Sequence, residues 1–217
     1  PVPQEAFKRQ TVPASDQNQS LPKGAEIAPQ LLQPGDQTTV CDFTPMWNSA
    51  TQRLLGIGQT VWYRNGRVMH TRPRGIAYAV YDQKSNGWNP WKVISLPDEK
   101  KFQSAGSGSA QRVDLPGGDV LIPCYFKEPE QTQYSVTVIR CRFDGETLNY
   151  VEHGNELTIP VKRGLYEPSL TKFQGKYFLT MRNDEAGYVS TSSDGLHFES
   201  ERKWTFDDGS DLGNYNT

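Results

Sequence analysis

The segment Arg163–Phe198 constrains the fold more than any other part of the chain. It reads RGLYEPSLTKFQGKYFLTMRNDEAGYVSTSSDGLHF, in which apolar or aromatic residues alternate with polar ones between turns rich in Gly, Asn and Asp. Alternation with a period of two residues, bounded by such turns, predicts β-strands joined as hairpins. We therefore expect four short strands in this segment, at Tyr166–Phe173, Lys176–Arg182, Gly187–Thr191 and Leu196–Ser200.

The same order of strands and turns occurs twice upstream. Asn48–Tyr63 and Gln111–Phe126 can be laid over Glu167–Arg182, and the following pair of strands recurs in Ala77–Val93, Ser135–Val151 and Tyr188–Trp204. The period is roughly sixty residues, which lies in the range of blade-like repeats. Because four consecutive antiparallel strands make one blade of a β-propeller, the sequence predicts an all-β propeller with about three blades in this chain.

The repeats also predict the domain organisation. Residues 1–40 are rich in Pro, Gln and Ser with little periodicity and are expected to form an extended arm, whereas residues 41–217 form a partial propeller domain. Its blades are expected at about 41–96, 106–157 and 163–204. Three blades leave apolar faces bare, so we expect the remaining blades to come from a longer chain or from a second copy.

Charge and composition exclude several classes of function. The net charge of -2 over 217 residues argues against a nucleic-acid partner, and no apolar run is long enough to span a membrane. The spacing of Cys41, Cys124 and Cys141 does not match a metal site, and we expect no metal and no cofactor. Cys124 and Cys141 fall on neighbouring predicted strands, where either a disulfide or buried free thiols would fit.

Part of the third repeat resembles a known family. The segment EPSLTKFQGKYFLTMRND is similar to the central motif of the sialidase (neuraminidase) superfamily, in which a Glu begins an inner strand and an Arg closes the next strand. The turn SSDGLHF resembles a shortened Asp-box, the turn of BNR repeats, and residues 41–217 resemble the N-terminal half of bacterial sialidase-like proteins. The resemblance implies a six-bladed propeller with an axial site, and a secreted or periplasmic glycoside hydrolase acting on sialic acid or a related acidic sugar.

The resemblance also implies roles for individual residues. In sialidases a Tyr attacks the anomeric carbon, a Glu activates it, an Asp protonates the leaving group and three Arg hold the substrate carboxylate. Glu167 corresponds to the activating Glu and Arg182 to one of the Arg residues, whose forked donors suit a carboxylate. A purely structural ion pair at a strand end is the other interpretation of these two residues.

Two other family positions differ in this sequence. The place of the first Arg reads Met46-Trp47-Asn48-Ser49, and the loop that should carry the acidic Asp, Arg67–Gly75, has no carboxylate. Within that loop His70 could donate a proton, and Arg72 or Arg74 could bind an anion. The third Arg and the Tyr nucleophile are expected beyond Thr217.

Two other functions fit the same residues. Furanosidase-like propeller hydrolases carry a carboxylate followed by Pro at a strand start and a Ser-x-Asp-Gly turn, as Glu167-Pro168 and Ser192–Gly195 do, and propeller polysaccharide lyases belong to the same class. A non-catalytic glycan-binding propeller is the third possibility. The run Gly106-Ser107-Gly108-Ser109 resembles no phosphate-binding loop and is expected to be a mobile loop at the mouth of the propeller.

Overall fold

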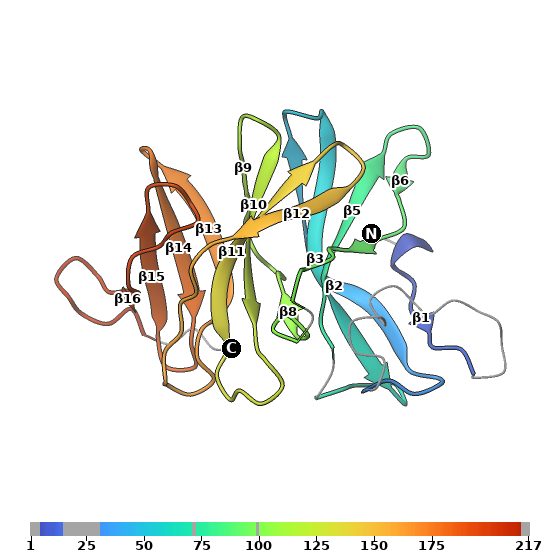
Figure 1. Cartoon of the computed structure of the whole chain (residues 1–217), viewed down its shortest axis with the longest axis horizontal. Coiled ribbons are helices and arrows are strands. Elements are labelled where there is room, and N and C mark those ends of the chain that lie inside the picture. Colours follow the sequence, from blue (N-terminus) through green and yellow to red (C-terminus); the bar gives the residue numbers. More distant parts are fainter. Residues whose placement is uncertain (1–4, 15–30, 71–72, 99, 214–217) are drawn as a thin grey trace.

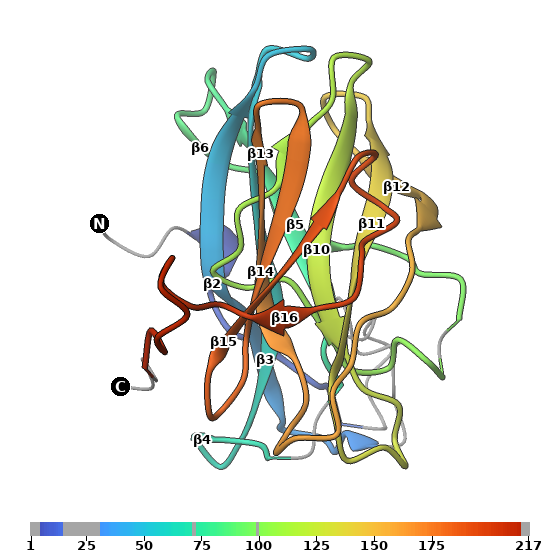
Figure 2. The same ribbon diagram turned by 90° about the vertical axis from the view of Figure 1, so that its left-hand side faces the viewer.

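The chain is built almost entirely of antiparallel β-strands, as predicted. The computed structural model describes residues 5–14, 31–70, 73–98 and 100–213. Within them helical structure is limited to 3-10 turns, at η1 (Glu5–Phe7) and at Leu31, and the strands form three separate sheets. Figure 1 shows the sheets standing side by side, in the order in which they occur along the chain, and Figure 2 views them from the side of the third sheet.

The first sheet contains the longest strands. It consists of β1 (Gln10–Thr11), β2 (Gln37–Asn48), β3 (Arg53–Arg64), β4 (Arg67–Val68), β5 (Ile76–Asp82), β6 (Gly87–Trp88) and β7 (Lys92–Val93). The central order is β2-β3-β5, and β1 extends the sheet from within the predicted N-terminal arm. Phe7 of the same arm packs its ring against Phe43 and Trp88, so the arm covers one face of this sheet.

The second and third sheets follow with short connections. The second consists of β8 (Ala105–Gly106), β9 (Val113–Asp114), β10 (Asp119–Phe126), β11 (Ser135–Phe143) and β12 (Leu148–His153). The third is the plain meander β13 (Tyr166–Phe173), β14 (Lys176–Arg182), β15 (Gly187–Ser192) and β16 (Arg202–Lys203). β13 and β14 have the predicted bounds, and β15 is longer than predicted by Ser192 alone.

The expectation of a fourth strand at Leu196–Ser200 is wrong. The backbone N–H groups of Leu196 and His197 both donate to Oδ1 of Asp194, so the turn takes the donors that a strand would use. Leu196 and Phe198 are buried in the core rather than paired in the sheet. The chain returns to the edge of the sheet at Glu199, whose N–H donates to the carbonyl of Thr191 at 2.9 Å, and strand pairing resumes at β16, where Arg202 pairs with Val189.

Two apolar layers join the sheets face to face. The layer between the first and second sheets contains Leu55, Ile57, Ile76, Val120, Ile122, Cys124, Ile139 and Cys141. The layer between the second and third contains Leu121, Val136, Val138, Leu165, Leu170, Leu179 and Met181. Alternate residues of β10 point into the two layers, as expected for a central sheet buried on both faces. Cys124 and Cys141 are free thiols inside the first layer, so the disulfide alternative is excluded in this structure.

The first strands of the first and third sheets carry the same irregularity. The pairing of β2 with β3 shifts between Cys41 and Thr44, and the pairing of β13 with β14 shifts between Tyr166 and Ser169. Inside each break lies an acidic residue with a left-handed backbone, Asp42 with φ 54° and Glu167 with φ 47°. The structural counterpart of Glu167 is therefore Asp42, and the overlay on Asn48 is out of register.

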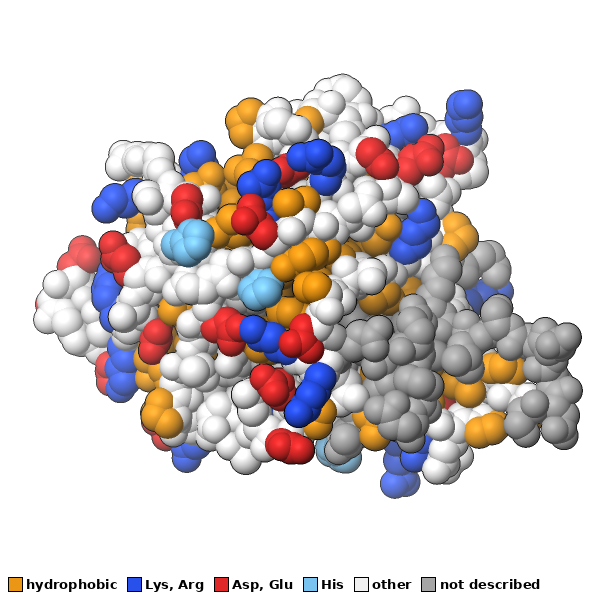
Figure 3. Space-filling model, viewed as in Figure 1, with side chains coloured by type: hydrophobic (Ala, Val, Ile, Leu, Met, Phe, Trp, Pro, Cys, Tyr) orange, Lys and Arg blue, Asp and Glu red, His pale blue; other side chains and the backbone are white. Residues whose placement is uncertain are grey.

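Among the described residues, no helix is long and apolar enough to cross a membrane. On the face shown in Figure 3, side chains of Lys and Arg are interspersed with those of Asp and Glu wherever the residues are described. This face therefore presents mixed charge rather than a broad basic surface of the kind that binds nucleic acid.

Candidate axial site

The structure brings the two principal predicted residues into contact. Glu167 lies in the bulge of β13, and Arg182 is the last residue of β14. Nη1 of Arg182 donates to Oε2 of Glu167 at 2.6 Å, and the two side chains are 39% and 40% exposed, respectively. A positive φ is uncommon for Glu, and β-bulges commonly re-aim a side chain at functional sites. The ion pair therefore lies at an accessible edge of the third sheet.

A cluster of tyrosine rings lies beside this ion pair. Tyr125 of β10, Tyr134 and Tyr166 have ring centroids separated by 5.5 Å (125 to 134), 6.4 Å (125 to 166) and 6.2 Å (134 to 166). The guanidinium carbon of Arg182 lies 5.2 Å from the ring centroid of Tyr166, which links the cluster to the ion pair. A cation within about 6 Å of a ring centroid is attracted to the ring.

Arg74 enters the same cluster from the segment that precedes β5, where its backbone bridges to Ser104. Its guanidinium carbon lies 4.9 Å from the ring centroid of Tyr125, and the residue is only 9% exposed. Its Nε and Nη1 atoms are buried, and neither has a hydrogen-bond partner among the described residues. Leaving buried charged donors unpaired costs free energy, so these two N–H groups lack the acceptor that a buried guanidinium normally has.

Glycine makes this close packing possible. A Cβ atom on Gly106 would lie 2.2 Å from Oε1 of Gln59 and 2.6 Å from Cδ of Arg74, distances that a side chain does not tolerate. Gly106 belongs to β8 and is buried, so the expectation of a mobile loop at Gly106–Ser109 is wrong. Gly106 instead packs directly against the side chains of Gln59 and Arg74.

A second ion pair, between Arg163 and Asp184, binds the hydroxyl of Tyr166 in the tyrosine cluster. Arg163 donates to Asp184 through Nη2 at 2.6 Å and through Nε at 2.9 Å, and the Tyr166 hydroxyl donates to the same carboxylate at 2.7 Å. The hydrogen bonds from Arg163 and then Tyr166 hold the pKa of Asp184 below its usual range. Burial, followed by the hydrogen bond to Asp184, raises the pKa of Tyr166 to about 12, so this phenol is held protonated.

Sequence reasoning missed a carboxylate in the first sheet. Oδ2 of Asp42 accepts a hydrogen bond from Nε2 of Gln59 at 2.8 Å, and Oε1 of Gln59 accepts one from the Tyr125 hydroxyl at 2.9 Å. Asp42 is thus joined through two hydrogen bonds to the tyrosine cluster beside Glu167. The position of Asp42 on the first strand of its repeat could have identified it. The overlay of Asn48 on Glu167 was out of register, however, and therefore pointed to the wrong residue.

Of the two remaining predicted residues, the structure describes only His70. His70 is exposed in the segment after β4 and makes no hydrogen bond to any described residue. Arg72 lies outside the described residues. Their roles therefore stay predictions.

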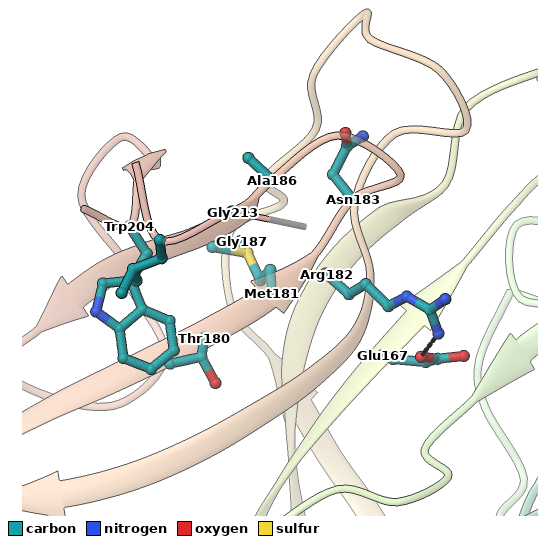
Figure 4. Close-up of a pocket in the computed structure, with 10 residues that line it drawn as sticks. Glu167, Thr180, Met181, Arg182, Asn183, Ala186, Gly187, Trp204 and Gly213 are labelled. Atoms are coloured by element: carbon teal, nitrogen blue, oxygen red, sulfur yellow. Dashed lines mark hydrogen bonds and ion pairs between the residues drawn. The ribbon is translucent and has the colours of Figure 1, made fainter. Parts of the chain in front are cut away.

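A cavity of about 430 Å³ opens directly beside Glu167 and Arg182. Its wall is formed by Glu167, Thr180, Met181, Arg182, Asn183, Ala186, Gly187, Trp204, Leu212 and Gly213. Figure 4 shows the carboxylate and guanidinium at one end and the indole of Trp204 at the other. The volume falls in the range of small-ligand sites, and a charged pair opposite an aromatic ring suits a molecule with a charged and an apolar side. In the part of the chain that the structure describes, no three His, Cys, Asp or Glu side chains are placed to hold a metal ion.

Comparison with known proteins identifies the fold. No family model and no curated protein sequence matches the chain. Among solved structures, it is similar to the Hadza microbial sialidase Hz136, with a TM-score of 0.57 and 15% identity over 94% of this chain and 40% of that one. It is similar to the Trypanosoma rangeli sialidase in complex with sialic acid, with a TM-score of 0.56 and 15% identity over 81% of this chain and 31% of that one.

A third similar structure is Zg3597, a family 117 glycoside hydrolase from Zobellia galactanivorans, with a TM-score of 0.54 and 14% identity over 93% of this chain and 61% of that one. The predicted fold class is therefore confirmed: the chain has a sialidase-like β-propeller fold, and the three sheets are successive blades. The chain spans less than two thirds of the length of each of these proteins. At such low identity the likeness concerns the fold alone.

Proposed function

We propose that this chain contributes to the axial site of a glycoside hydrolase that acts on sialic acid or a related acidic sugar. The observation that supports this most strongly is the juxtaposition of the Glu167–Arg182 pair with the buried, unpaired guanidinium of Arg74 around one tyrosine cluster. An acidic sugar needs a carboxylate-binding cation next to a group that handles protons, and both lie at this edge of the blades.

The role that each residue would have in the reaction follows from its contacts. Arg74 offers two buried N–H groups without protein acceptors, so a substrate carboxylate would remove their desolvation cost on binding. Glu167 accepts from Arg182 through Oε2 and would act on the proton of the nucleophile. Arg72 and His70 stay candidates for binding the substrate from the first blade. Similar propellers that are sialidases by name support the choice of an acidic sugar.

Hydrolysis of a fluorogenic sialoside tests the proposal. We expect kcat/KM to fall by about 10² to 10⁴ in Glu167→Gln, because a positioned proton-transfer group contributes about this factor. Arg182→Ala and Arg74→Ala should raise KM, and Lys176→Ala, on the exposed opposite end of β14, is the matched control. A wild-type protein that leaves sialosides intact would remove the acidic-sugar hydrolase from consideration.

One observation favours a second candidate, a hydrolase of a neutral sugar. Asp42 adds a second accessible carboxylate to the same cluster, and a similar propeller is a family 117 glycoside hydrolase. Most glycoside hydrolases work with two carboxylates and no carboxylate-binding arginines. A panel of neutral aryl glycosides alongside the sialoside separates the two candidates, because only the first candidate requires Arg74.

We also propose that further blades complete the propeller and that the protein is secreted or periplasmic. Phe178 and Thr180 of β14 face away from the second sheet, and on this side Phe173 is 61% and Phe206 54% exposed. Another sheet, from a longer chain or a second copy, would cover these rings. The secreted or periplasmic location is part of the same proposal, and fractionation of producing cells would test it.

A further inference from the structure

The bulges of β2 and β13 present two versions of one structural unit. In each, a strand residue pairs across the hairpin just before the break, Cys41 with Gln59 and Tyr166 with Arg182. The next residue is the acidic one with positive φ, and its carboxylate binds the side chain of that same cross-strand partner. Asp42–Gln59 and Glu167–Arg182 are therefore equivalent pairs, although no sequence motif connects them.

The backbone holds these two units close to a common centre. The N–H of Ser109, which has φ 53°, donates to the carbonyl of Asp42 at 2.9 Å. Two residues further along the same segment, Gln111 accepts from the N–H of Leu170 at 3.0 Å. The second blade thus bridges the first strands of its neighbours, and both carboxylates border the tyrosine cluster.

The two units differ in the chemistry of their partners. Glu167 is paired with a guanidinium, whereas the described residues that donate to Asp42 are neutral, the amide of Gln59 at 2.8 Å and the thiol of Cys41 at 3.3 Å. Burial raises the pKa of Cys41 to about 12, so its thiol stays protonated and donates. Both donors bind Oδ2, and no hydrogen bond from the described residues reaches Oδ1 of Asp42. Arg74 makes no ion pair with Asp42 in the described part of the chain.

We propose that Asp42 is a second catalytic carboxylate of this site, which transfers the proton at the glycosidic oxygen. This role rests on the hydrolase function proposed above, and it supplies the carboxylic acid that the loop Arg67–Gly75 does not contain. When two carboxylates in one site lie in different environments, one can transfer a proton while the other has a different role. Arg182 holds Glu167 in an ion pair, whereas Oδ1 of Asp42 accepts no hydrogen bond from the described residues and so is open to the oxygen of a substrate.

The step balances without any further reactant. The nucleophile bonds to the anomeric carbon and gives its proton to Glu167, while the glycosidic C–O bond breaks with its electron pair remaining on the leaving oxygen, which takes the proton from Oδ1 of Asp42. Water then displaces the nucleophile from the anomeric carbon, one proton of the water returns to Asp42, and the nucleophile recovers its proton from Glu167. The net change is the addition of one water molecule across the bond.

Asp42→Asn tests the proposal with little risk to the fold. Asn tolerates a left-handed backbone, so the residue keeps its φ of 54°, and its amide oxygen still accepts from Gln59. The assay compares two sialosides that differ in their need for a proton donor. The leaving group of 4-methylumbelliferyl sialoside departs as a stable phenolate, whereas sialyllactose needs protonation. Urea denaturation confirms folding, and Glu130→Gln, an exposed carboxylate that the structure places in no site, is the control.

We expect kcat/KM of Asp42→Asn to fall by more than about 100-fold on sialyllactose and by less than about 10-fold on the aryl sialoside. A purely structural role would lower both alike, so an equal fall overturns the proposal, as does an unchanged rate on both substrates. These two results leave the proposed function standing. A wild-type protein inactive on both substrates instead overturns the proposed function, and the role of Asp42 with it.

Discussion

Removal of the Asp184 carboxylate should destabilise the third blade next to the Glu167–Arg182 ion pair. Asp184 is the shared acceptor for Arg163 and for the hydroxyl of Tyr166, and its own side chain is 25% exposed. In Asp184→Ala the guanidinium of Arg163, whose side chain is 56% exposed, returns to water at small cost. The Tyr166 hydroxyl accepts from Nη2 of Arg163 at 2.7 Å, but its own proton would have neither Asp184 nor water to bind, because the residue is 3% exposed.

The magnitude follows from these two losses. An ion pair with one exposed partner contributes about 0.2 to 1 kcal/mol after solvent screening. A buried hydroxyl left without an acceptor costs about 1 to 3 kcal/mol. The free energy of unfolding should therefore fall by about 2 kcal/mol, which lowers Tm by roughly 4 to 8 °C for a chain of this size. Tyr166→Phe in the Asp184→Ala background should recover roughly half of the loss, because it removes the orphaned hydroxyl.

The same contact makes the effect depend on pH. The pKa of Asp184 is lowered in the folded chain, chiefly by the hydrogen bond from Arg163. A lowered carboxyl pKa gives stability that is present above the unfolded value, about 3.9, and is lost as the pH falls below it. The difference between wild type and Asp184→Ala should therefore be constant from pH 7 to 5 and shrink towards pH 3.

Urea denaturation followed by tryptophan fluorescence at several pH values measures this difference. Equal midpoints for wild type and variant at pH 7, or a difference that grows on acidification, would refute the reasoning. Tyr166→Phe alone keeps the Arg163–Asp184 ion pair and separates the contribution of the hydroxyl from that of the charge.

Three other outcomes are expected. Leu170→Ala should lower the free energy of unfolding by about 2 to 5 kcal/mol, because this fully buried side chain fills the layer between the second and third sheets; an unchanged urea midpoint would contradict that packing. Cys124 and Cys141 should react with a thiol reagent only after unfolding, because burial raises the pKa of both thiols, that of Cys141 to about 12; rapid native-state labelling at pH 8 would argue against it. Gly108→Ala should depress kcat/KM on sialosides by more than about tenfold, since its Cβ would lie 2.7 Å from both Cβ of Asp42 and Nε2 of Gln59, whereas Gly117→Ala, with no atom within 4 Å, should behave as wild type.

The comparison of sequence with structure is clearest in the third blade. The bounds of β13 and β14 and the meeting of Glu167 with Arg182 follow from local pairing alone. A two-residue turn at Gln174-Gly175 sets the register of the hairpin, and counting back along both strands brings Glu167 opposite Arg182. The one-residue bulge between Tyr166 and Ser169 then makes Tyr166 the backbone partner of Arg182, with Glu167 next to it. Alternation within a few residues is sufficient for such a prediction.

The fourth strand and the first blade show where local alternation fails. Leu196 and Phe198 alternate as a strand would, but the side chain of Asp194 binds the backbone donors and the two residues serve the core instead. In β2 the bulge at Asp42 shifts the period by one residue, so the pattern gives no sign of which residue matches Glu167.

The sequence by itself determined that the chain forms successive antiparallel sheets and that Glu167 meets Arg182, because hairpin pairing depends on neighbours a few residues apart. Only the tertiary structure decided that Asp42, Arg74 and Tyr125 join them. These three come from segments far apart in the chain, and they meet because the apolar faces of the sheets pack in one order and the backbone at Gly106 leaves room for Arg74. Long-range packing of faces leaves no local pattern in a sequence, which is why the cluster was visible only once the sheets were assembled.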